Sequence, residues 1–409
     1  MSGANSDHVS PSNIVRVQVP GSKSVTQRAL VAAALAPGRS RIHGALRCDD
    51  SAHLTDGLQQ MGVDIDWSDE ALLVTGTNQL HAPSDPLFLG NAGTAVRFST
   101  ALALLADGPV TIDGVEAMRH RPMPGLLDAL SQMGAQVTTL RRPGRPPVRI
   151  EPPQDRALRH VELDPAGSSQ QLSALLLVGP AMGGVEIHLT GPLPSSPYVD
   201  LTIQVMEAFG AHVDRRDHAT YVVADKPYVA RDFTVEADHS SASYPLAAGW
   251  LTNRQVEIPN LDQNSLQPDR VFADHLARLD SPGPLEFDLE ESPDIAPTLA
   301  VCALFRKAPT VLSGLRHLAI KESNRLEVLA TELQKLGADI AVRSDGWEIR
   351  PASLVGPARL DPASDHRMAM CFGLVGLVVP GVEVSDPGCV SKSYPNFWRM
   401  LDGFRSREK

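Results

Sequence analysis

The sequence predicts an α/β protein built from six repeated units, and three observations support this fold class. An amphipathic helix that ends in glycine and leads into a strand recurs along the chain. An almost entirely apolar helix with a polar first turn recurs between its copies. The chain also has 409 residues, more than the roughly 250–300 at which a single hydrophobic core stops growing. Two domains are therefore expected.

The amphipathic helix is clearest in four places, where apolar residues follow the i, i+3, i+4, i+7 spacing of a helix with one buried face. Gly62, Gly134, Gly210 and Gly337 close these segments, and glycine suits the left-handed position that ends a helix. Two weaker copies bring the number to six. The segments are HLTDGLQQMGVDIDW, MPGLLDALSQMGAQVTTL, YVDLTIQVMEAFGAHVDRR, NRLEVLATELQKLGADIAV, PDRVFADHLARL and PNFWRMLDGF.

The apolar helix also occurs six times, as SKSVTQRALVAAALA, GTAVRFSTALALLA, SSQQLSALLLVGPAM, SSASYPLAAGWL, PDIAPTLAVCALF and DHRMAMCFGLVGLV. Successive starts are separated by 72, 74, 72, 54 and 72 residues, measured between Ser22, Thr94, Ser168, Ser240, Asp294 and His366. This period exceeds the roughly 20–50 residues of a solenoid repeat. Each unit is therefore expected to hold two helices and accompanying strands.

Helices without a polar face are expected to lie buried inside each domain. If symmetry relates the units, their six polar starts point towards a common region. The N-terminus of a helix carries about half a positive charge and unpaired N–H groups, which favour anions. The architecture alone therefore predicts an anion-binding site.

Composition narrows the class of protein. The net charge of −11 argues against a nucleic-acid or anionic-membrane surface. Cys48, Cys302, Cys371 and Cys389 show neither C-x-x-C pairing nor metal-ligand spacing, so reduced, buried thiols and no metal site are expected. The polar start SGANSDHVSPSN lacks a signal pattern, and the apolar stretches are too short and broken to span a bilayer. A cytoplasmic protein is predicted.

The polar helix starts carry candidate ligand-binding residues. The run PGSKSVTQR resembles a phosphate loop but lacks the first glycine of that motif. Helix capping is the simpler explanation for each start taken alone. The first three starts supply Lys23, Ser24, Arg28, Gly93, Thr94, Arg97, Ser168, Ser169 and Gln170.

Further cations stand beside Gly, Pro and Ser turns at the boundaries between units. A charge run is usually a solvated face, and Glu322 with Arg325 also fits a simple i,i+3 pair. Repetition of such cations in an acidic chain favours a small ligand with several anionic groups, because arginine binds carboxylate and phosphate bidentately. The cations are Arg119, Arg121, Lys321, Arg325, Arg367 and Lys392.

Acid–base candidates are fewer. Asp294 starts the fifth apolar helix, where a carboxylate can also be a cap, and Glu322 follows Lys321. A carboxylate among cations has a lowered pKa unless burial opposes it, so either can act as a base or proton relay. His317 and His366 are further candidates, and no Ser-His-Asp or Cys-His arrangement stands out.

Ten motifs occur in the order found in the 5-enolpyruvylshikimate-3-phosphate synthase family, which the chain resembles from about residue 15 to 402. They are PGSKSVTQR, LFLGNAGTAVRF, RHRP, GSSQQLSALL, SSPYVDLT, SSASY, PDIAP, KESNRL, DHRMAM and SKSYPNF. The resemblance implies a two-domain inverse α/β barrel with three βαβαββ units per domain. One domain would hold residues 21–232 and the other residues 1–20 and 233–409, with the active site in the cleft between them.

That family transfers the enolpyruvyl group of phosphoenolpyruvate to the 5-hydroxyl of shikimate 3-phosphate and releases phosphate by addition and elimination. The resemblance therefore implies a monomeric transferase of the shikimate pathway that uses no cofactor. Its motifs assign to shikimate 3-phosphate the residues Lys23, Ser24, Arg28, Ser168, Ser169, Gln170, Ser195, Tyr198, Asp294, His317 and Lys321. They assign to phosphoenolpyruvate the residues Lys23, Gly93, Arg121, Gln170, Arg325, Arg367 and Lys392.

The resemblance also implies the catalytic roles. Asp294, directly or through Lys321, would take the proton of the attacking hydroxyl. Glu322, Lys23 and Lys392 all remain candidates for protonating the methylene carbon. Closure of the two domains would exclude water that competes for the activated enolpyruvyl group.

Three positions depart from the usual family pattern. Phe98 stands where proline is common, Asn324 where aspartate is common, and His317 where asparagine is also found. The Gly-Thr-Ala run at 93–95 resembles forms that are sensitive to the inhibitor glyphosate, so sensitivity is expected.

Two other functions remain open. UDP-N-acetylglucosamine enolpyruvyl transferases share the fold and the donor, but they usually carry a reactive cysteine in the loop that reads DGVEAMRHRP here. A catalytically silent anion-binding or scaffold protein is the second alternative. Loss of Asp294, Lys321 or Glu322 would favour it, and all three are present.

Overall fold

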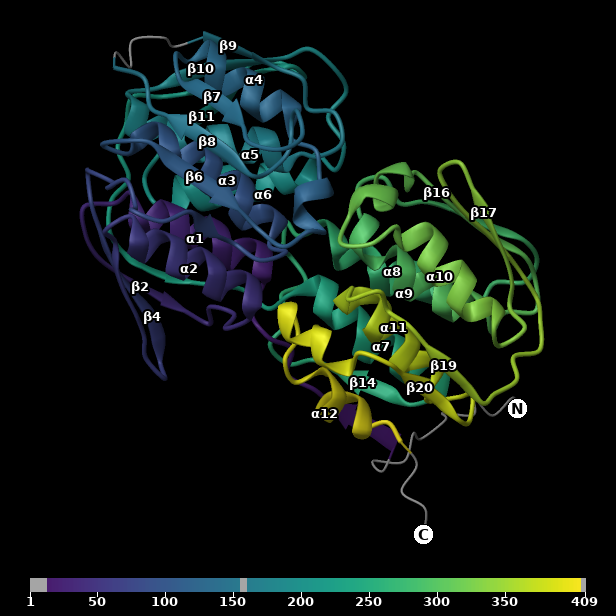
Figure 1. Cartoon of the computed structure of the whole chain (residues 1–409). Helices are drawn as coiled ribbons and strands as arrows, with labels where there is room; N and C mark the ends of the chain where they lie inside the picture. The colour runs from purple at the N-terminus through teal and green to yellow at the C-terminus, as the bar shows by residue number, and fades with distance from the viewer. Residues whose placement is uncertain (1–12, 155–159, 406–409) are drawn as a thin grey trace.

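The chain forms two lobes (Figure 1). The computed structural model describes residues 13–154 and 160–405, so most of the polar amino-terminal segment discussed above lies outside the described residues. Buried apolar side chains fall into two clusters, one drawn from residues 25–235 and the other from residues 17–19 and 237–404. We call the surrounding parts of the chain the first lobe and the second lobe.

Three four-stranded sheets form the strand layer of the first lobe, and all three share one pattern. In each sheet one outer pair of strands is parallel and the other two pairs are antiparallel. The strands, in sheet order, are β13 (Asp232–Thr234), β2 (Gly38–His43), β4 (Ala71–Gly76) and β3 (Asp64–Trp67); β5 (Leu87–Phe88), β6 (Val110–Asp113), β8 (Val148–Glu151) and β7 (Gln136–Thr139); and β9 (His160–Leu163), β10 (Val185–Leu189), β12 (Thr220–Val223) and β11 (Val213–Arg215).

The second lobe is less regular. One sheet repeats the four-stranded pattern, with β15 (Leu285–Asp288), β16 (Thr310–Ser313), β18 (Gly346–Arg350) and β17 (Asp339–Arg343). The other two sheets are parallel pairs: β1 (Ile14–Arg16) with β14 (Gln255–Glu257), and β19 (Ala358–Leu360) with β20 (Val382–Val384). The first of these pairs ties the start of the described chain to the second lobe.

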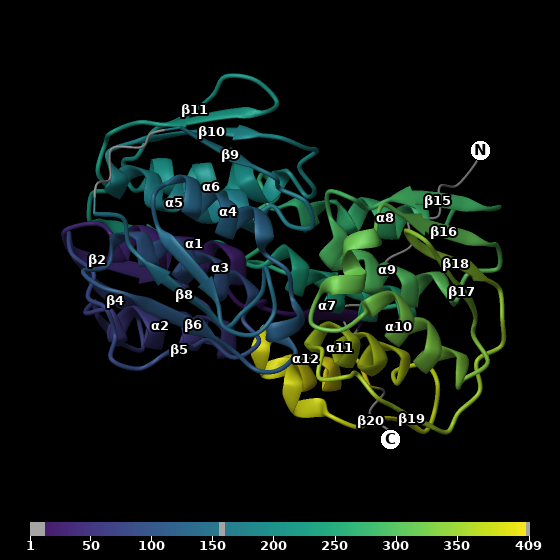
Figure 2. The ribbon, with the colours of Figure 1, turned by 45° about the horizontal axis from the view of Figure 1, so that its top comes forward.

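The six apolar helices are confirmed, and they are buried along nearly their whole length. Their Ala, Leu and Val side chains leave no polar face to present to water, so they pack against one another inside the lobes (Figure 2). The helices are α1 (Lys23–Ala34), α3 (Gly93–Leu102) and α5 (Gln170–Val178) in the first lobe, and α7 (His239–Thr252), α9 (Ala296–Ala303) and α11 (His366–Val375) in the second.

The amphipathic helices are also present. Gly62, Gly134, Gly210 and Gly337 follow four of them with φ of +91°, +87°, +90° and +86°, which confirms the left-handed endings. These four helices are α2 (Asp49–Gln60), α4 (Pro124–Gln132), α6 (Pro197–Ala208) and α10 (Arg325–Gln334), and the two weaker copies are α8 (Phe272–Arg278) and α12 (Phe397–Asp402).

The weaker helices belong to the units with two-stranded sheets. Helix α8 ends at Arg278 and β15 begins at Leu285, which leaves too few residues for an antiparallel hairpin. Helix α12 ends at Asp402, three residues before the end of the described chain. The shorter 54-residue step between helix starts reflects the first of these differences.

Four short 3₁₀ turns carry residues that matter below. They are η5 (Pro268–Val271), η6 (Pro293–Ile295), η7 (Arg316–Ile320) and η8 (Pro387–Lys392), all in the second lobe. Within the described residues, none of the helices is long and apolar enough to cross a membrane. All four cysteines are free; Cys48, Cys302 and Cys371 are buried as expected, whereas Cys389 is only half-buried.

Candidate active site

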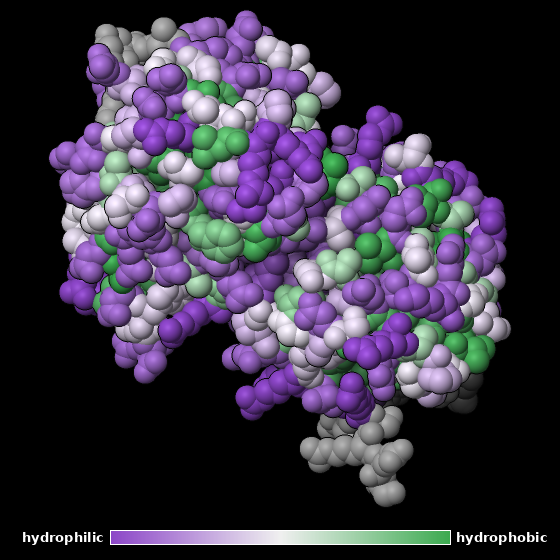
Figure 3. Space-filling view, in the orientation of Figure 1, coloured by the Kyte–Doolittle hydropathy of each residue, from purple (hydrophilic) through white to green (hydrophobic). Residues whose placement is uncertain are grey.

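A polar cavity lies between the two lobes, where hydrophilic side chains gather in the space-filling view (Figure 3). It has two adjoining parts, which we call the first compartment and the second compartment. Five residues line both parts: Lys23, Thr94, Gln170, Asp294 and Lys321. The starts of five apolar helices, α1, α3, α5, α9 (through η6) and α11, reach the cavity, as predicted. The sixth start was predicted wrongly, because no residue of α7 lines either part and its Ser240 donates to Asp269 instead.

The first compartment brings together every residue that the sequence assigned to shikimate 3-phosphate. Serine and glutamine side chains at the start of α5 face a loop and helix start carrying Ser195 and Tyr198. The second lobe adds a carboxylate, a histidine and an amine. The assigned residues found here are Lys23, Ser24, Arg28, Ser168, Ser169, Gln170, Ser195, Tyr198, Asp294, His317 and Lys321.

Arg28 is held rigidly at the floor of this compartment. Its Nε donates to Thr202 Oγ1 at 2.7 Å, Nη1 to the Ser24 carbonyl at 2.9 Å and Nη2 to the Tyr198 carbonyl at 3.2 Å. The guanidinium carbon also lies 5.7 Å from the centre of the Phe98 ring. The aromatic ring at this unusual position therefore packs against a ligand-binding candidate.

Ser195 adopts a backbone conformation that is uncommon for a residue with a side chain. Its φ is +51°, in the left-handed region, and its Oγ donates to the Glu290 carbonyl at 3.3 Å. Strain of this kind persists where the surrounding structure fixes it, and such positions cluster at binding sites. The contact also joins the first lobe to the second.

The second compartment is dominated by arginine and carboxylate side chains. Arg325 donates to Asp365 Oδ2 at 2.7 Å, to Glu322 Oε2 at 2.8 Å and to Asp294 Oδ1 at 3.3 Å. Arg367 donates to Asp294 Oδ2 at 2.8 Å. The residues that line this part are Lys23, Asp50, Gly93, Thr94, Arg121, Gln170, Asp294, Lys321, Glu322, Arg325, His366 and Arg367.

Arg121 approaches the start of α3 so closely that any side chain at residue 93 would displace its guanidinium group. A Cβ built on Gly93 would lie 2.7 Å from both Nη1 and Nη2 of Arg121. On its other side, Arg121 Nη1 is 3.5 Å from Glu322 Oε1, so this arginine also bridges the two lobes.

Asp294 and Glu322 are both ionised in the ligand-free cavity. Burial alone would raise the pKa of each carboxyl, but cations outweigh it. Arg367 and Arg325 hold the pKa of Asp294 well below its usual value, and Arg121 and Arg325 do the same for Glu322. Both side chains can therefore accept a proton or a hydrogen bond near neutral pH.

Lys321 and His317 have lowered pKa values for a common reason. Burial lowers the pKa of Lys321 to about 8; the charge of Asp294 opposes this decrease, and the smaller effect of Arg325 adds to it. Burial, and then the charge of Lys321, lowers the pKa of His317 to about 4. His317 is therefore neutral at pH 7, and Lys321 can exchange its proton close to neutral pH.

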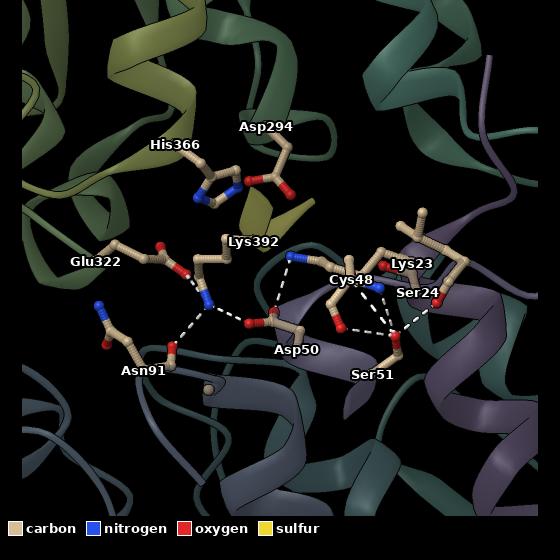
Figure 4. Close-up of polar contacts among 12 residues, drawn as sticks. Lys23, Ser24, Cys48, Asp50, Ser51, Asn91, Asp294, Glu322, His366 and Lys392 are labelled. Atoms are coloured by element: carbon tan, nitrogen blue, oxygen red, sulfur yellow. Dashed lines mark hydrogen bonds and ion pairs between the residues drawn. The ribbon is translucent and has the colours of Figure 1, made fainter. Parts of the chain in front are cut away.

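Lys392 reaches across from η8 and ends at the edge of the second compartment without lining it. Its Nζ contacts Asp50 Oδ1, donates to the Asn91 carbonyl at 2.9 Å and lies 3.9 Å from Glu322 Oε1 (Figure 4). Lys23 Nζ lies 3.3 Å from the other carboxylate oxygen of Asp50. Of the residues assigned to phosphoenolpyruvate, Lys392 alone stands outside the lining of the two compartments in the described chain.

Sequence reasoning missed two buried carboxylates at the site, Asp50 and Asp269, and it gave no role to a third, Asp365 of the DHRMAM motif. Asp365 pairs with Arg325, and Asp269 accepts one hydrogen bond from Tyr198 of the first lobe and one from Ser240 of its own lobe. Asp50 and Asp365 stand in or beside the first turn of a helix, where an acidic residue is ordinarily attributed to capping. Nothing in their local sequence distinguishes them from caps.

Two expected cations do not reach the cavity. Arg119 pairs with Asp113 at 2.6 Å and with Glu116 at 3.5 Å, so the prediction that it helps to bind an anionic ligand was wrong. Arg97 donates to the carbonyl oxygens of Gly93 and Pro122, each at 3.0–3.1 Å, and to Gln170 Oε1 at 3.1 Å. Arg97 therefore stabilises the first turn of α3 without lining the cavity.

The sequence matches one protein family along almost its whole length. The family model described as EPSP synthase (3-phosphoshikimate 1-carboxyvinyltransferase) covers residues 13–401. The 3-phosphoshikimate 1-carboxyvinyltransferase of Rhizobium leguminosarum bv. trifolii is 41% identical over 402 residues, which are 94% of this chain and 93% of the relative. The protein of that name from Pseudomonas syringae pv. syringae is 40% identical over 394 residues, 94% of each chain.

Solved structures share the fold. EPSP synthase from Acinetobacter baumannii aligns with a TM-score of 0.78 at 24% identity and covers 95% of both chains. The enolpyruvyl transferase NikO from Streptomyces tendae aligns with a TM-score of 0.72 at 19% identity, covering 95% of this chain and 94% of that one. The shared α/β fold confirms the predicted fold class at that level.

Proposed function

The chain belongs to the EPSP synthase family, and on that premise we propose how its cavity residues divide the reaction between them. The enzyme is a 3-phosphoshikimate 1-carboxyvinyltransferase. It transfers the enolpyruvyl group of phosphoenolpyruvate to the 5-hydroxyl of shikimate 3-phosphate in the shikimate pathway. The roles of individual residues, given below, are the proposal.

Shikimate 3-phosphate occupies the first compartment. Its phosphate lies at the start of α5, where Ser168, Ser169 and Ser195 donate hydrogen bonds to an anion that the helix terminus favours. Ser24 and Arg28 hold its carboxylate. The ring hydroxyls face Asp294 and Lys321, and the remaining lining residues that contact it are Lys23, Gln170, Tyr198 and His317.

Phosphoenolpyruvate occupies the second compartment. Arg121, Arg325 and Arg367 match its phosphate and carboxylate, because a guanidinium group binds such anions with two parallel hydrogen bonds. The main chain at Gly93 approaches the ligand closely. Lys23, Gln170 and Lys392 complete the set.

The observation that carries this proposal is the position of Asp294, which lines both compartments. An ionised carboxylate at the junction can take the proton of the attacking hydroxyl as the new C–O bond forms, with Lys321 beside it as a relay. Three candidates remain for protonating the methylene carbon: Lys23, Glu322 and Lys392. Lys23 is protonated because the carboxylates of Asp50, Glu322 and Asp294 together outweigh burial and raise its pKa, whereas the cations around Glu322 lower its pKa and keep it ionised.

We also propose the finer architecture implied by the family. The chain would form an inverse α/β barrel of six βαβαββ-derived units in two domains, residues 21–232 and residues 1–20 with 233–409. The two separate cores and the contacts that bridge the lobes support this division. The protein would act in the cytoplasm as a monomer without a cofactor.

Phosphate release tests the function directly. Purified protein is incubated with phosphoenolpyruvate and one acceptor in each of two reactions. The acceptor is shikimate 3-phosphate in the first reaction and UDP-N-acetylglucosamine in the second. We expect phosphate release with shikimate 3-phosphate as the acceptor and no release with UDP-N-acetylglucosamine. Release only with the nucleotide sugar would identify the other enolpyruvyl transferase, and release with neither acceptor would indicate an anion-binding protein without this activity.

A further inference from the structure

Asp50 is a carboxylate placed inside a cavity whose other features favour anions. It belongs to the first turn of α2 and is 2% exposed. Its two oxygens contact two different amines: Lys23, 3.3 Å away on the first lobe, and Lys392, which comes from η8 of the second lobe (Figure 4). It lines the second compartment, where phosphoenolpyruvate is proposed to bind.

Helix capping does not explain this side chain. The residue before the helix is Cys48, and the capping box is completed by Ser51, whose Oγ accepts from the Cys48 backbone N–H at 3.0 Å. The Asp50 carboxylate takes no part in that arrangement. Any favourable interaction with the helix dipole would be available equally to the adjacent Asp49, which lies outside the cavity lining.

Charged groups from several elements act on Asp50 and its amines. Around Asp50 lie Lys23 of α1, Lys392 of η8, Glu322 ahead of α10 and the Cys48 thiol; beyond Lys23 lie Asp294, His366 and Arg367. Burial would raise the pKa of Asp50, but Lys392 and Lys23 keep it low. Burial would lower the pKa of Lys23, and Asp50 is the strongest of the charges that raise it instead.

A negative side chain at this point repels an incoming anionic substrate. If the cavity only had to bind anions, a neutral residue would serve better. The carboxylate is therefore expected to act through the amines that it contacts, by fixing the positions of both and by raising the pKa of Lys23. Lys392 in particular reaches the cavity only where Asp50 and the Asn91 carbonyl hold it.

We propose that Asp50 is a positioning residue of the transferase, which gathers Lys23 and Lys392 from the two lobes into one charged pair at the phosphoenolpyruvate compartment. This inference rests on the proposed function. It predicts a result opposite to simple electrostatics: removal of the negative charge weakens the binding of the anionic substrate.

The test compares Asp50→Asn with the matched control Asp49→Asn at pH 7. Asp49 is on the same helical turn and also bridges the lobes, because Ser391 Oγ donates to its Oδ2 at 2.6 Å. For Asp50→Asn we expect kcat/KM for phosphoenolpyruvate to fall by about 30-fold or more, as for loss of one partner of a buried charge pair. The KM for shikimate 3-phosphate should change by less than about twofold, and Asp50→Glu should recover part of the loss. Asp49→Asn should match the unsubstituted protein.

A second readout does not depend on activity. Site-resolved acetylation followed by mass spectrometry, between pH 7 and 10, reports the uncharged fraction of each amine. In Asp50→Asn the Lys23 profile should move to lower pH, because the strongest charge that raises the pKa of this amine is removed. Lys321 serves as the internal reference, because Asp50 is not among the charges that set its pKa.

The outcomes separate this inference from the function on which it rests. An unsubstituted protein that releases no phosphate would overturn the function, while acetylation would still test the pairing with Lys23. Equal or tighter phosphoenolpyruvate binding in Asp50→Asn overturns the positioning role. So does an equal loss in Asp49→Asn, or an unchanged Lys23 profile.

Discussion

A methyl group added at residue 93 is expected to disturb one compartment of the cavity and spare the other. In Gly93→Ala the new Cβ would lie 2.7 Å from both Nη atoms of Arg121 and 2.8 Å from its Cζ. Carbon and nitrogen atoms pack comfortably at about 3.5 Å or more, so the guanidinium group must retreat by roughly 0.8 Å. Because the clash involves the far end of a flexible side chain, the fold should survive.

The displacement should weaken binding of phosphoenolpyruvate selectively. A misplacement of about 1 Å at a positioning residue can cost around 100-fold in rate, so we expect kcat/KM for this substrate to fall by about 10- to 100-fold. Arg121 does not line the first compartment. The KM for shikimate 3-phosphate should therefore change by less than about twofold.

Steady-state phosphate release, with each substrate varied in turn, measures both effects. The control is the double variant with Arg121→Lys, which removes the planar group that the methyl group would strike. In that background Gly93→Ala should have a much smaller effect, because the two changes act on one contact. An equal rise in KM for both substrates, or an undiminished effect in the double variant, would refute the steric explanation.

Three further predictions concern charge and inhibition. Lys321 has a pKa near 8 because it is buried, so kcat/KM for shikimate 3-phosphate should fall above about pH 8. In Lys321→Arg this decline should move to higher pH. A decline at the same pH in the variant would show that another group causes it. Burial, with Asp294, raises the pKa of Asp269 to about 7, so ionisation of this carboxyl destabilises the fold increasingly from about pH 4 to 7. Relative to the unsubstituted protein, Asp269→Asn should therefore become more stable as pH rises, with a difference in free energy of unfolding on the order of 3 kcal/mol by pH 8. Urea denaturation of both proteins at pH 5 and at pH 8 measures this difference. The same difference at both pH values would contradict the prediction. Glyphosate should inhibit in competition with phosphoenolpyruvate, and an inhibition curve that stays flat into the millimolar range would count against sensitivity.

The helices and their starts were predictable because their signals are local. Burial on every face of α1 follows from its run of Ala, Val and Leu, and the φ of +91° at Gly62 follows from glycine after an amphipathic segment. Lys23 and Arg28 were recognised because cations at the start of a buried helix have few purely structural explanations.

Carboxylates that pair across the cavity were not predictable from local sequence. Asp50 contacts Lys392, which lies 342 residues away in the sequence, and Asp365 contacts Arg325, which lies 40 residues away. In both places the short-range interpretation, an acid near a helix N-terminus, is physically sound on its own. For Arg119 the opposite mistake was made: a distant ligand was predicted for this side chain, but its partner is Asp113, six residues earlier in the sequence.

The strand pattern of the second lobe shows a different limit. The helix signals of α8 and α12 were recognised as weak copies, but within the described residues the segment between α8 and β15 is too short for the antiparallel hairpin of the other units. Repetition of helix starts therefore predicted the units better than it predicted their sheets.

The central claim is that Asp294 takes the hydroxyl proton where the two compartments meet. The most direct measurement is the turnover number of Asp294→Asn, together with equilibrium binding of each substrate. The amide keeps the size of the side chain but has one acceptor oxygen, so it can replace the bond from Arg325 to Oδ1 or the bond from Arg367 to Oδ2, and not both. Loss of a general base should lower kcat by about 100- to 10,000-fold while both substrates still bind. Near-normal turnover with intact binding would contradict the account.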